Sequence, residues 1–146
     1  MAGKAPLLLE LKTERDGLAS ALCRAVLRDL EGYGGPHAVM SFDPRVARWF
    51  AGHAPGIVRG LVVSEADARG WRGALGRHRA LWRARPDFLA YDVCDLPSAF
   101  AATQRARGLP VATWTVSTPA LRERAAIHAD SSIAEAEGVA SGRSSP

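Results

Sequence analysis

Short apolar runs that alternate with longer helical segments are the feature of this sequence that most constrains its fold. We expect strands to start at residues 6, 37, 57, 88, 111 and 131, at intervals of 20 to 31 residues. In the first segment between them, Leu18, Leu22 and Val26 recur on one helix face. A strand–helix repeat of this length implies parallel strands joined by crossover helices. A closed barrel of that kind takes eight units and about 250 residues, so six units in 146 residues predict either an open doubly wound sheet or part of a barrel.

The runs and their boundaries define the expected elements. Predicted strands cover residues 6–11, 37–41, 57–63, 88–93, 111–116 and 131–134. Predicted helices cover residues 16–30, 44–52, 66–83, 96–107 and 119–128, the third with a glycine interruption at 70–76. Asp43 followed by Pro44 predicts the start of the second helix, since Asp is a good N-cap and Pro suits the first helical position. Residues 139–146 are small and polar and are expected to be disordered, which leaves residues 1–138 as one domain.

Composition says more about the cellular location of the protein than about its function. No apolar run approaches the roughly 20 residues that cross a bilayer, and residues 1–6 contain no apolar stretch long enough for a secretory signal. We therefore expect a cytoplasmic protein with no membrane span. Cys23 and Cys94 form no CxxC or Cys–His metal pattern, and Cys23 is expected to be a buried free thiol.

The charge of the chain is basic, with 19 basic and 15 acidic residues and a net charge of +4. Its arginine-rich stretch covers residues 69–85. A basic stripe can bind nucleic acid. We expect instead a solvated helix face and no nucleic-acid partner, because no RNP-like or helix–turn–helix pattern accompanies the charge.

The first candidate for chemistry is the pair Glu10 and Lys12, at the end of the first apolar run. In a strand, positions i and i+2 share a face, and parallel α/β folds build their sites at the C-terminal ends of strands. A carboxylate there can hold a hard cation, and a lysine can meet a phosphate. On spacing alone, the alternative that both side chains point into solvent stays open.

Two further candidates lie at the ends of later runs. Ser41 can donate a hydrogen bond at the mouth of a barrel, whereas the neighbouring Asp43 is explained as a helix N-cap. Trp114 shares a strand face with Val116. Its position favours either the wall of a substrate pocket or a place in the core.

These residues, in this order, resemble the glycerophosphodiester phosphodiesterase family. The matching segments are LLLELKTE at 7–14, AVMSFDPR at 38–45, APGIVRGLV at 54–62, RPDFLAYDV at 85–93, GLPVATWTV at 108–116 and ADSSIAEAEG at 129–138. The resemblance implies an incomplete TIM (β/α)₈ barrel of about six units, without the first two strands. It implies hydrolysis of a glycerophosphodiester to glycerol 3-phosphate and an alcohol, with a divalent cation, calcium or magnesium.

The resemblance also assigns residues. Glu10 falls on a metal ligand, Lys12 on the residue that faces the phosphate, and Trp114 on the residue that lines the pocket mouth, beside Ser41 as a further substrate contact. Glu135 falls where several members carry an acidic residue.

The chain departs from the family pattern at its start. The family's HRG segment, Glu-x-Asp pair and His-Asp pair all precede the Glu-Leu-Lys segment, and only nine residues precede Glu10 here. We therefore assign no catalytic residue and expect the general acid and base to be absent. None of the four histidines is expected at the C-terminal end of a strand; they are His37, His53, His78 and His128. One carboxylate holds a hard cation poorly, so cation binding and turnover by this chain alone are not expected.

The leading interpretation is therefore a truncated, inactive fragment of a metal-dependent phosphoric diester hydrolase of glycerophospholipid metabolism. The alternative is a non-catalytic barrel remnant that associates with another chain through its open edge strands. A third reading, an unrelated α/β module for a small anion, predicts a glycine-rich phosphate loop after the first strand, and residues 12–17 do not form one.

Overall fold

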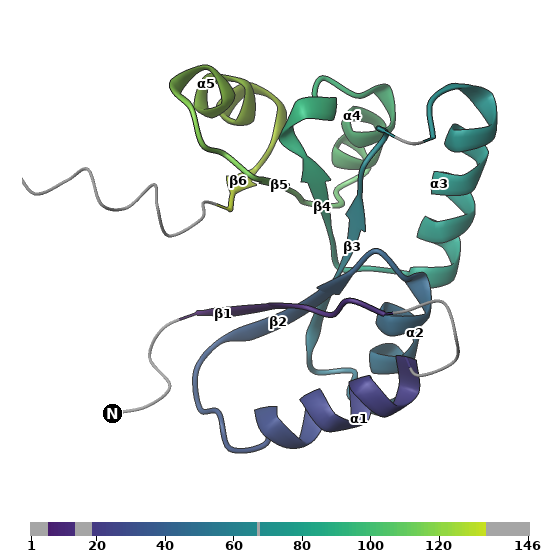
Figure 1. Ribbon diagram of the computed structural model, residues 1–146, viewed down its shortest axis with the longest axis vertical. Helices are drawn as coiled ribbons and strands as arrows, with labels where there is room; N and C mark the ends of the chain where they lie inside the picture. The colour runs from purple at the N-terminus through teal and green to yellow at the C-terminus, as the bar shows by residue number, and fades with distance from the viewer. Residues whose placement is uncertain (1–5, 14–18, 67, 134–146) are drawn as a thin grey trace, which may run out of the picture.

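The computed structural model describes residues 6–13, 19–66 and 68–133, which form one curled sheet with helices along its outer side (Figure 1). The strands are β1 (Leu7–Glu10), β2 (His37–Ser41), β3 (Val58–Val63), β4 (Phe88–Asp92), β5 (Val111–Trp114) and β6 (Ser131–Ser132). The helices are α1 (Ala19–Leu30), α2 (Pro44–His53), α3 (Gly70–Ala84), α4 (Ala99–Ala106) and α5 (Pro119–His128), with a 3₁₀ turn at Val93–Asp95. The predicted order of strands and helices is confirmed.

The sheet settles the choice between a doubly wound sheet and part of a barrel. Each strand pairs in parallel with the next one in the chain, in the order β1-β2-β3-β4-β5-β6. A doubly wound sheet reverses its strand order and carries helices on both faces. Here the order never reverses, and the described residues form six of the eight strands that a closed (β/α)₈ barrel contains.

The two faces of the sheet bury different partners. On the outer face, Val39 packs with residues of α1 and α2, and Leu61 and Leu89 pack with residues of α2, α3 and α4. On the inner, concave face, a smaller apolar cluster contains no helix residue. Its members are Met40, Val62, Ala90, Phe88, Trp114 and Ile133. Helices on one face only are the arrangement of a barrel wall.

Gly60 belongs to the inner face and shows how tightly this face is filled. A Cβ at this position would lie 2.4 Å from Cζ of Phe88, the residue beside it in the register of β3 and β4. The Phe88 ring therefore covers Gly60 on the concave side, and a side chain at position 60 would displace it.

The helix starts follow local sequence signals. Asp43 caps α2 as predicted, since its side chain accepts a hydrogen bond from the Arg45 N–H and Pro44 takes the first turn. The predicted start of α4 at residue 96 was wrong, because the Ser98 hydroxyl accepts from the Ala101 N–H and α4 begins after it. The fifth strand also ends at Trp114 rather than at residue 116.

The predicted glycine interruption at 70–76 was wrong, because α3 runs without a break from Gly70. Gly70 has φ +84°, which favours glycine, and starts the helix. Gly73 is buried, and a Cβ there would lie 1.5 Å from the Ala68 carbonyl oxygen. This glycine therefore allows the loop before α3 to cross closely over the helix.

Cys23 is a buried free thiol, as predicted, with no exposed surface. Burial raises its pKa to about 11, and the nearby Asp43 carboxylate adds to this effect. Among the described residues, no helix combines the length and apolarity that a bilayer crossing requires. The predicted disorder of residues 139–146, and Glu135, lie outside the described residues.

Candidate functional site

A cavity of about 450 Å³ opens at the C-terminal ends of β1, β2 and β5. It brings together the four described residues that the sequence singled out, which come from positions up to 104 residues apart (114 − 10). Its lining consists of Glu10, Leu11, Lys12, Thr13, Ser41, Phe42, Trp114 and Thr115. The C-terminal end of parallel strands is where barrel enzymes place their active sites.

Glu10 and Lys12 line this cavity from the concave face of the sheet. Between them, Leu11 is buried in the outer apolar cluster, so strand alternation turns its two neighbours to the inner face. Both side chains are exposed, and neither makes a hydrogen bond or ion pair with any residue that the structure describes. A free carboxylate and a free ammonium group therefore line one cavity. Their roles toward a cation and a phosphate stay predictions.

Ser41 is engaged in holding the strand ends together. Its hydroxyl donates to the Leu11 carbonyl oxygen at 2.6 Å and accepts from the Asp43 N–H at 3.1 Å. The residue is 2% exposed. Its single hydroxyl hydrogen is directed into the protein, so Ser41 shapes the cavity wall and has no hydrogen left to give to a ligand.

Asp43 makes a second tie between the same two strand ends. Thr13 donates to its carboxylate at 3.0 Å, and Arg45 pairs with it at 2.7 Å. Burial opposes ionisation of the carboxyl group, but the hydrogen bonds from Arg45 and Thr13 outweigh it and hold the pKa of Asp43 below its ordinary value. The rim of the cavity next to Lys12 is thus fixed by two independent contacts between β1 and β2.

Trp114 is both a core residue and a pocket wall. Its indole N–H donates to the Ala90 carbonyl oxygen at 3.0 Å, and its ring packs against the inner apolar cluster. The exposed Phe42 ring meets it edge to face at 5.9 Å between centroids. With its polar edge satisfied inside the protein, Trp114 offers the cavity an apolar surface in a fixed orientation.

The donor set fits one ligand of a hard cation and not a complete coordination sphere. Ca²⁺ takes 6–8 oxygen ligands and Mg²⁺ about six, whereas Glu10 is the one carboxylate that lines the cavity. Over residues 6–13, 19–66 and 68–133, no group of three or more His, Cys, Asp or Glu side chains is placed to hold a metal ion.

The histidines lie away from the cavity, as the sequence predicted. His37 begins β2, and His53, His78 and His128 lie on α2, α3 and α5. His53 stacks on Trp49 at 4.2 Å and its Nδ1 lies 2.9 Å from the Trp49 carbonyl oxygen. None of the four reaches the C-terminal end of a strand.

Sequence reasoning missed a polar cluster around Glu65, on the loop after β3. Its carboxylate accepts hydrogen bonds from Tyr91 and, at 2.6 Å, from Ser98, and pairs with Arg77 at 3.1 Å. Burial and the Glu65 carboxylate raise the pKa of Tyr91, which stays a neutral phenol. The cluster ties α3 and α4 to the ends of β3 and β4 from the outer face and does not line the cavity. No local sequence motif predicts the Glu65 cluster, because its members lie 7 to 33 residues apart.

Comparison with known proteins defines the class of fold. No known family model matches the sequence, and no curated protein matches it. Among solved structures, the chain is similar to an Oleispira antarctica phosphodiesterase in complex with the product sn-glycerol-3-phosphate, with a TM-score of 0.70 and 22% identity over 88% of this chain and 51% of that one. A Silicibacter pomeroyi protein described as a glycerophosphoryl diester phosphodiesterase gives a TM-score of 0.68 and 22% identity over 87% and 46%.

A Thermotoga maritima glycerophosphodiester phosphodiesterase gives a TM-score of 0.63 and 16% identity over 90% of this chain and 54% of that one. The chain thus spans about half the length of the solved structures it matches. The fold is that of part of a TIM barrel. More particularly, it is a six-stranded part of the barrel that this chain has in common with these phosphodiesterase structures, and the expected incomplete barrel is confirmed.

Proposed function

We propose that this chain supplies part of the active site of a glycerophosphodiester phosphodiesterase, which hydrolyses a glycerophosphodiester to glycerol 3-phosphate and an alcohol. Glu10 serves as one ligand of a divalent cation, calcium or magnesium, Lys12 meets the phosphate, and Trp114 forms the wall beside the glycerol. The observation that carries the proposal is the single cavity into which these three residues project, in a half-barrel similar to phosphodiesterases.

Charge and geometry make the cavity suitable for a phosphate group. Lys12 gives a positive charge with no carboxylate partner among the described residues, and a lysine ammonium has three N–H donors for phosphate oxygens. Phe42 and Trp114 give the adjacent apolar surface that the carbon skeleton of a glycerol can contact. A cation at Glu10 would supply charge neutralisation for the phosphate when bound.

The test of this assignment is equilibrium binding of sn-glycerol 3-phosphate by calorimetry, with and without magnesium. We expect Lys12→Ala to weaken binding about tenfold or more, the size of one lost charge-assisted hydrogen bond. Arg28→Ala, which removes an exposed cation on α1, is the matched control and should leave binding unchanged. Equal loss in both variants, or no loss in Lys12→Ala, would contradict the assignment.

Turnover requires acid–base groups that binding of the substrate does not require. Hydrolysis of a phosphodiester needs a general base for water and a general acid for the leaving oxygen, and no histidine of the described residues lines the cavity. We therefore expect no turnover of glycerophosphocholine by the 146-residue chain with calcium or magnesium. Turnover that disappears in Glu10→Gln and persists in Glu31→Gln would keep the site and overturn this part of the mechanism.

A second candidate function is association with another chain through the sheet edges. Among the described residues, β1 and β6 each pair with one strand, and Leu7 and Leu8 on β1 are 36% and 37% exposed. An edge strand with exposed leucines favours pairing with another strand. Sedimentation velocity should then show a species larger than the monomer, and Leu8→Lys should shift it toward the monomer. A monomer at all concentrations would exclude self-association.

A further inference from the structure

The outer side of α3 has an unusual polarity. Trp71, Leu75 and Trp82 are 71%, 51% and 73% exposed. At 3.6 residues per turn, these three positions fall within about 40° around the helix axis and form one apolar ridge. The opposite side of the helix buries Gly73 and Ala84. A surface helix normally turns its large apolar side chains inward and its polar ones outward, whereas the described fold leaves this ridge uncovered.

Arginines flank the ridge without acidic partners. Arg72, Arg79 and Arg83 lie about 80° to 120° around the helix from Trp71 and are all exposed. No carboxylate of the described residues pairs with any of the three. α3 itself contains no Asp or Glu in its 15 residues. The outer side of α3 therefore combines exposed aromatic and aliphatic groups with uncompensated positive charge.

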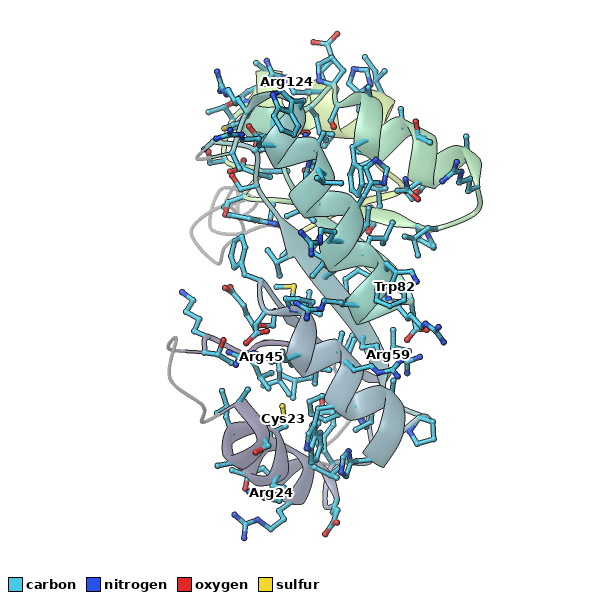
Figure 2. All side chains as sticks on the ribbon, turned by 90° about the vertical axis from the view of Figure 1, so that its right-hand side faces the viewer. Cys23, Arg24, Arg45, Arg59, Trp82 and Arg124 are labelled. Carbon is cyan, nitrogen blue, oxygen red and sulfur yellow. The ribbon has the colours of Figure 1, made fainter. Side chains whose placement is uncertain are left out.

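A groove of about 660 Å³ beside Trp82 extends this surface onto α2. It is lined by Pro44, Arg45, Arg48, Trp49, His53, Trp82, Arg83 and Arg85. Figure 2 shows Trp82 and Arg45 on the same side of the molecule, on the neighbouring helices α3 and α2. Arg45 is paired with Asp43, whereas Arg48, Arg83 and Arg85 make no ion pair with any described residue. No acidic side chain lines the groove, which suits a phosphate group.

We propose that this face of α2 and α3 binds the surface of an anionic phospholipid bilayer. The ridge lies in the boundary between head groups and acyl chains, with the α3 axis in the membrane plane, and the arginines meet lipid phosphates. A helix with Trp and Leu on one side and arginines beside them has the composition of an interfacial helix. Tryptophan favours the head-group level, and arginine can extend its charge toward water from there.

The arrangement disfavours other occupants. α3 connects β3 to β4, the two central strands of the six, so strands that extend the sheet beyond β1 or β6 do not lie over it. A second copy in a symmetric contact would bring the arginines of one face against those of the other, which is unfavourable. Phosphate contacts of nucleic acid would use the arginines but would leave Leu75 and both tryptophans exposed. The proposal is independent of the catalytic one, since no residue of the cavity takes part.

The test is flotation of the full chain with vesicles of phosphatidylcholine alone and of an equal mixture with phosphatidylglycerol. We expect binding to the mixed vesicles only. Arg79→Glu/Arg83→Glu should weaken it by about 25-fold or more, at roughly fivefold for each arginine lost. The matched control is Arg24→Glu/Arg28→Glu, which changes an exposed pair of the same spacing and charge on α1 and should cost far less.

A second pair of variants tests the ridge. Trp71→Ser/Leu75→Ser should weaken binding about tenfold or more, because it removes two inserted side chains. Ile127→Ser removes a 61% exposed residue on α5 and should have no effect. Circular dichroism checks that each variant is folded.

Three results would overturn the proposal. Vesicle binding that needs the arginines and is unchanged in Trp71→Ser/Leu75→Ser would exclude insertion. Self-association that this ridge variant abolishes, without vesicle binding, would assign the face to a second copy. Binding of duplex DNA that depends on Arg79 and Arg83, without vesicle binding, would assign it to nucleic acid.

Discussion

Ser41→Ala separates a structural from a ligand-binding role for the serine at the cavity. The substitution removes a hydrogen bond to the Leu11 carbonyl oxygen and one from the Asp43 N–H, at a residue that is 2% exposed. At about 1 kcal/mol net for each buried hydrogen bond, the free energy of unfolding should fall by about 2 kcal/mol. Alanine fills nearly the same volume, so little of this change comes from packing.

Urea unfolding followed by circular dichroism measures this change. Ser132→Ala, at an exposed position on β6, is the control and should change the free energy of unfolding by less than about 0.5 kcal/mol. The dependence on urea concentration should stay the same in both variants. Two results together would refute the structural role and would show that Ser41 contacts the ligand. They are a decrease in the free energy of unfolding of less than about 0.5 kcal/mol in Ser41→Ala, and a loss of glycerol 3-phosphate affinity as large as in Lys12→Ala.

Three further predictions follow from single residues. Asp43→Asn keeps the helix cap but loses the charge. Because the folded pKa of Asp43 is lowered, the wild-type carboxylate stabilises the fold above its unfolded pKa of about 3.9 and loses this effect as the pH falls through the folded pKa. Unfolding curves between pH 7 and 2 should thus show a smaller acid-induced loss in the variant, and identical slopes would contradict this. Gly60→Ala should cost about 1–3 kcal/mol, less in a Phe88→Leu background, because the added methyl meets the ring; additive costs would exclude that contact. The pKa values of both thiols are raised, but Cys94 is exposed and Cys23 is buried, so a thiol reagent at pH 8 should label Cys94 first and Cys23 only on unfolding.

The sequence was sufficient for the order of elements, whereas spacing alone left open whether Glu10 and Lys12 face a site or solvent. Period-two alternation around the buried Leu11 placed Glu10 and Lys12 on one face, and the structure puts both in one cavity. Asp43 and Pro44 gave the start of α2 because capping depends on neighbouring residues alone. Local patterns of this kind can be read without the tertiary structure.

Features that depend on distant partners could not be predicted in this way. The hydroxyl of Ser41 is directed to a carbonyl group 30 residues away, and the Glu65 cluster joins residues up to 33 positions apart. Residues 70–76 were predicted as a glycine interruption of the helix, because the close approach of Ala68 to Gly73 is invisible in the sequence. The arginines of α3 were expected to be solvated, and Arg72, Arg79 and Arg83 are exposed. Arg77 departs from this expectation, because its side chain is 12% exposed and pairs with Glu65. The ridge beside them was not recognised, since it appears only when the buried side of the helix is known.

Open sheet edges are the feature of this fold with the clearest dynamic consequence. Within the part of the chain that the structure describes, β1 and β6 have a strand partner on one side, whereas β3 and β4 are paired on both. Hydrogen exchange should therefore be fastest near Glu10 and Ser131 and slowest in the two central strands. Uniformly slow exchange across all six strands would show that the edges are covered, and would contradict the open half-barrel.

Binding of substrate in the cavity is best tested by a nuclear magnetic resonance titration of the ¹⁵N-labelled chain with sn-glycerol 3-phosphate in the presence of magnesium. We expect the largest shifts at Glu10, Lys12 and the Trp114 indole N–H, and we expect Lys12→Ala to remove them. Shifts concentrated on the arginine-lined groove between α2 and α3, with none at the cavity, would contradict the assignment of the site.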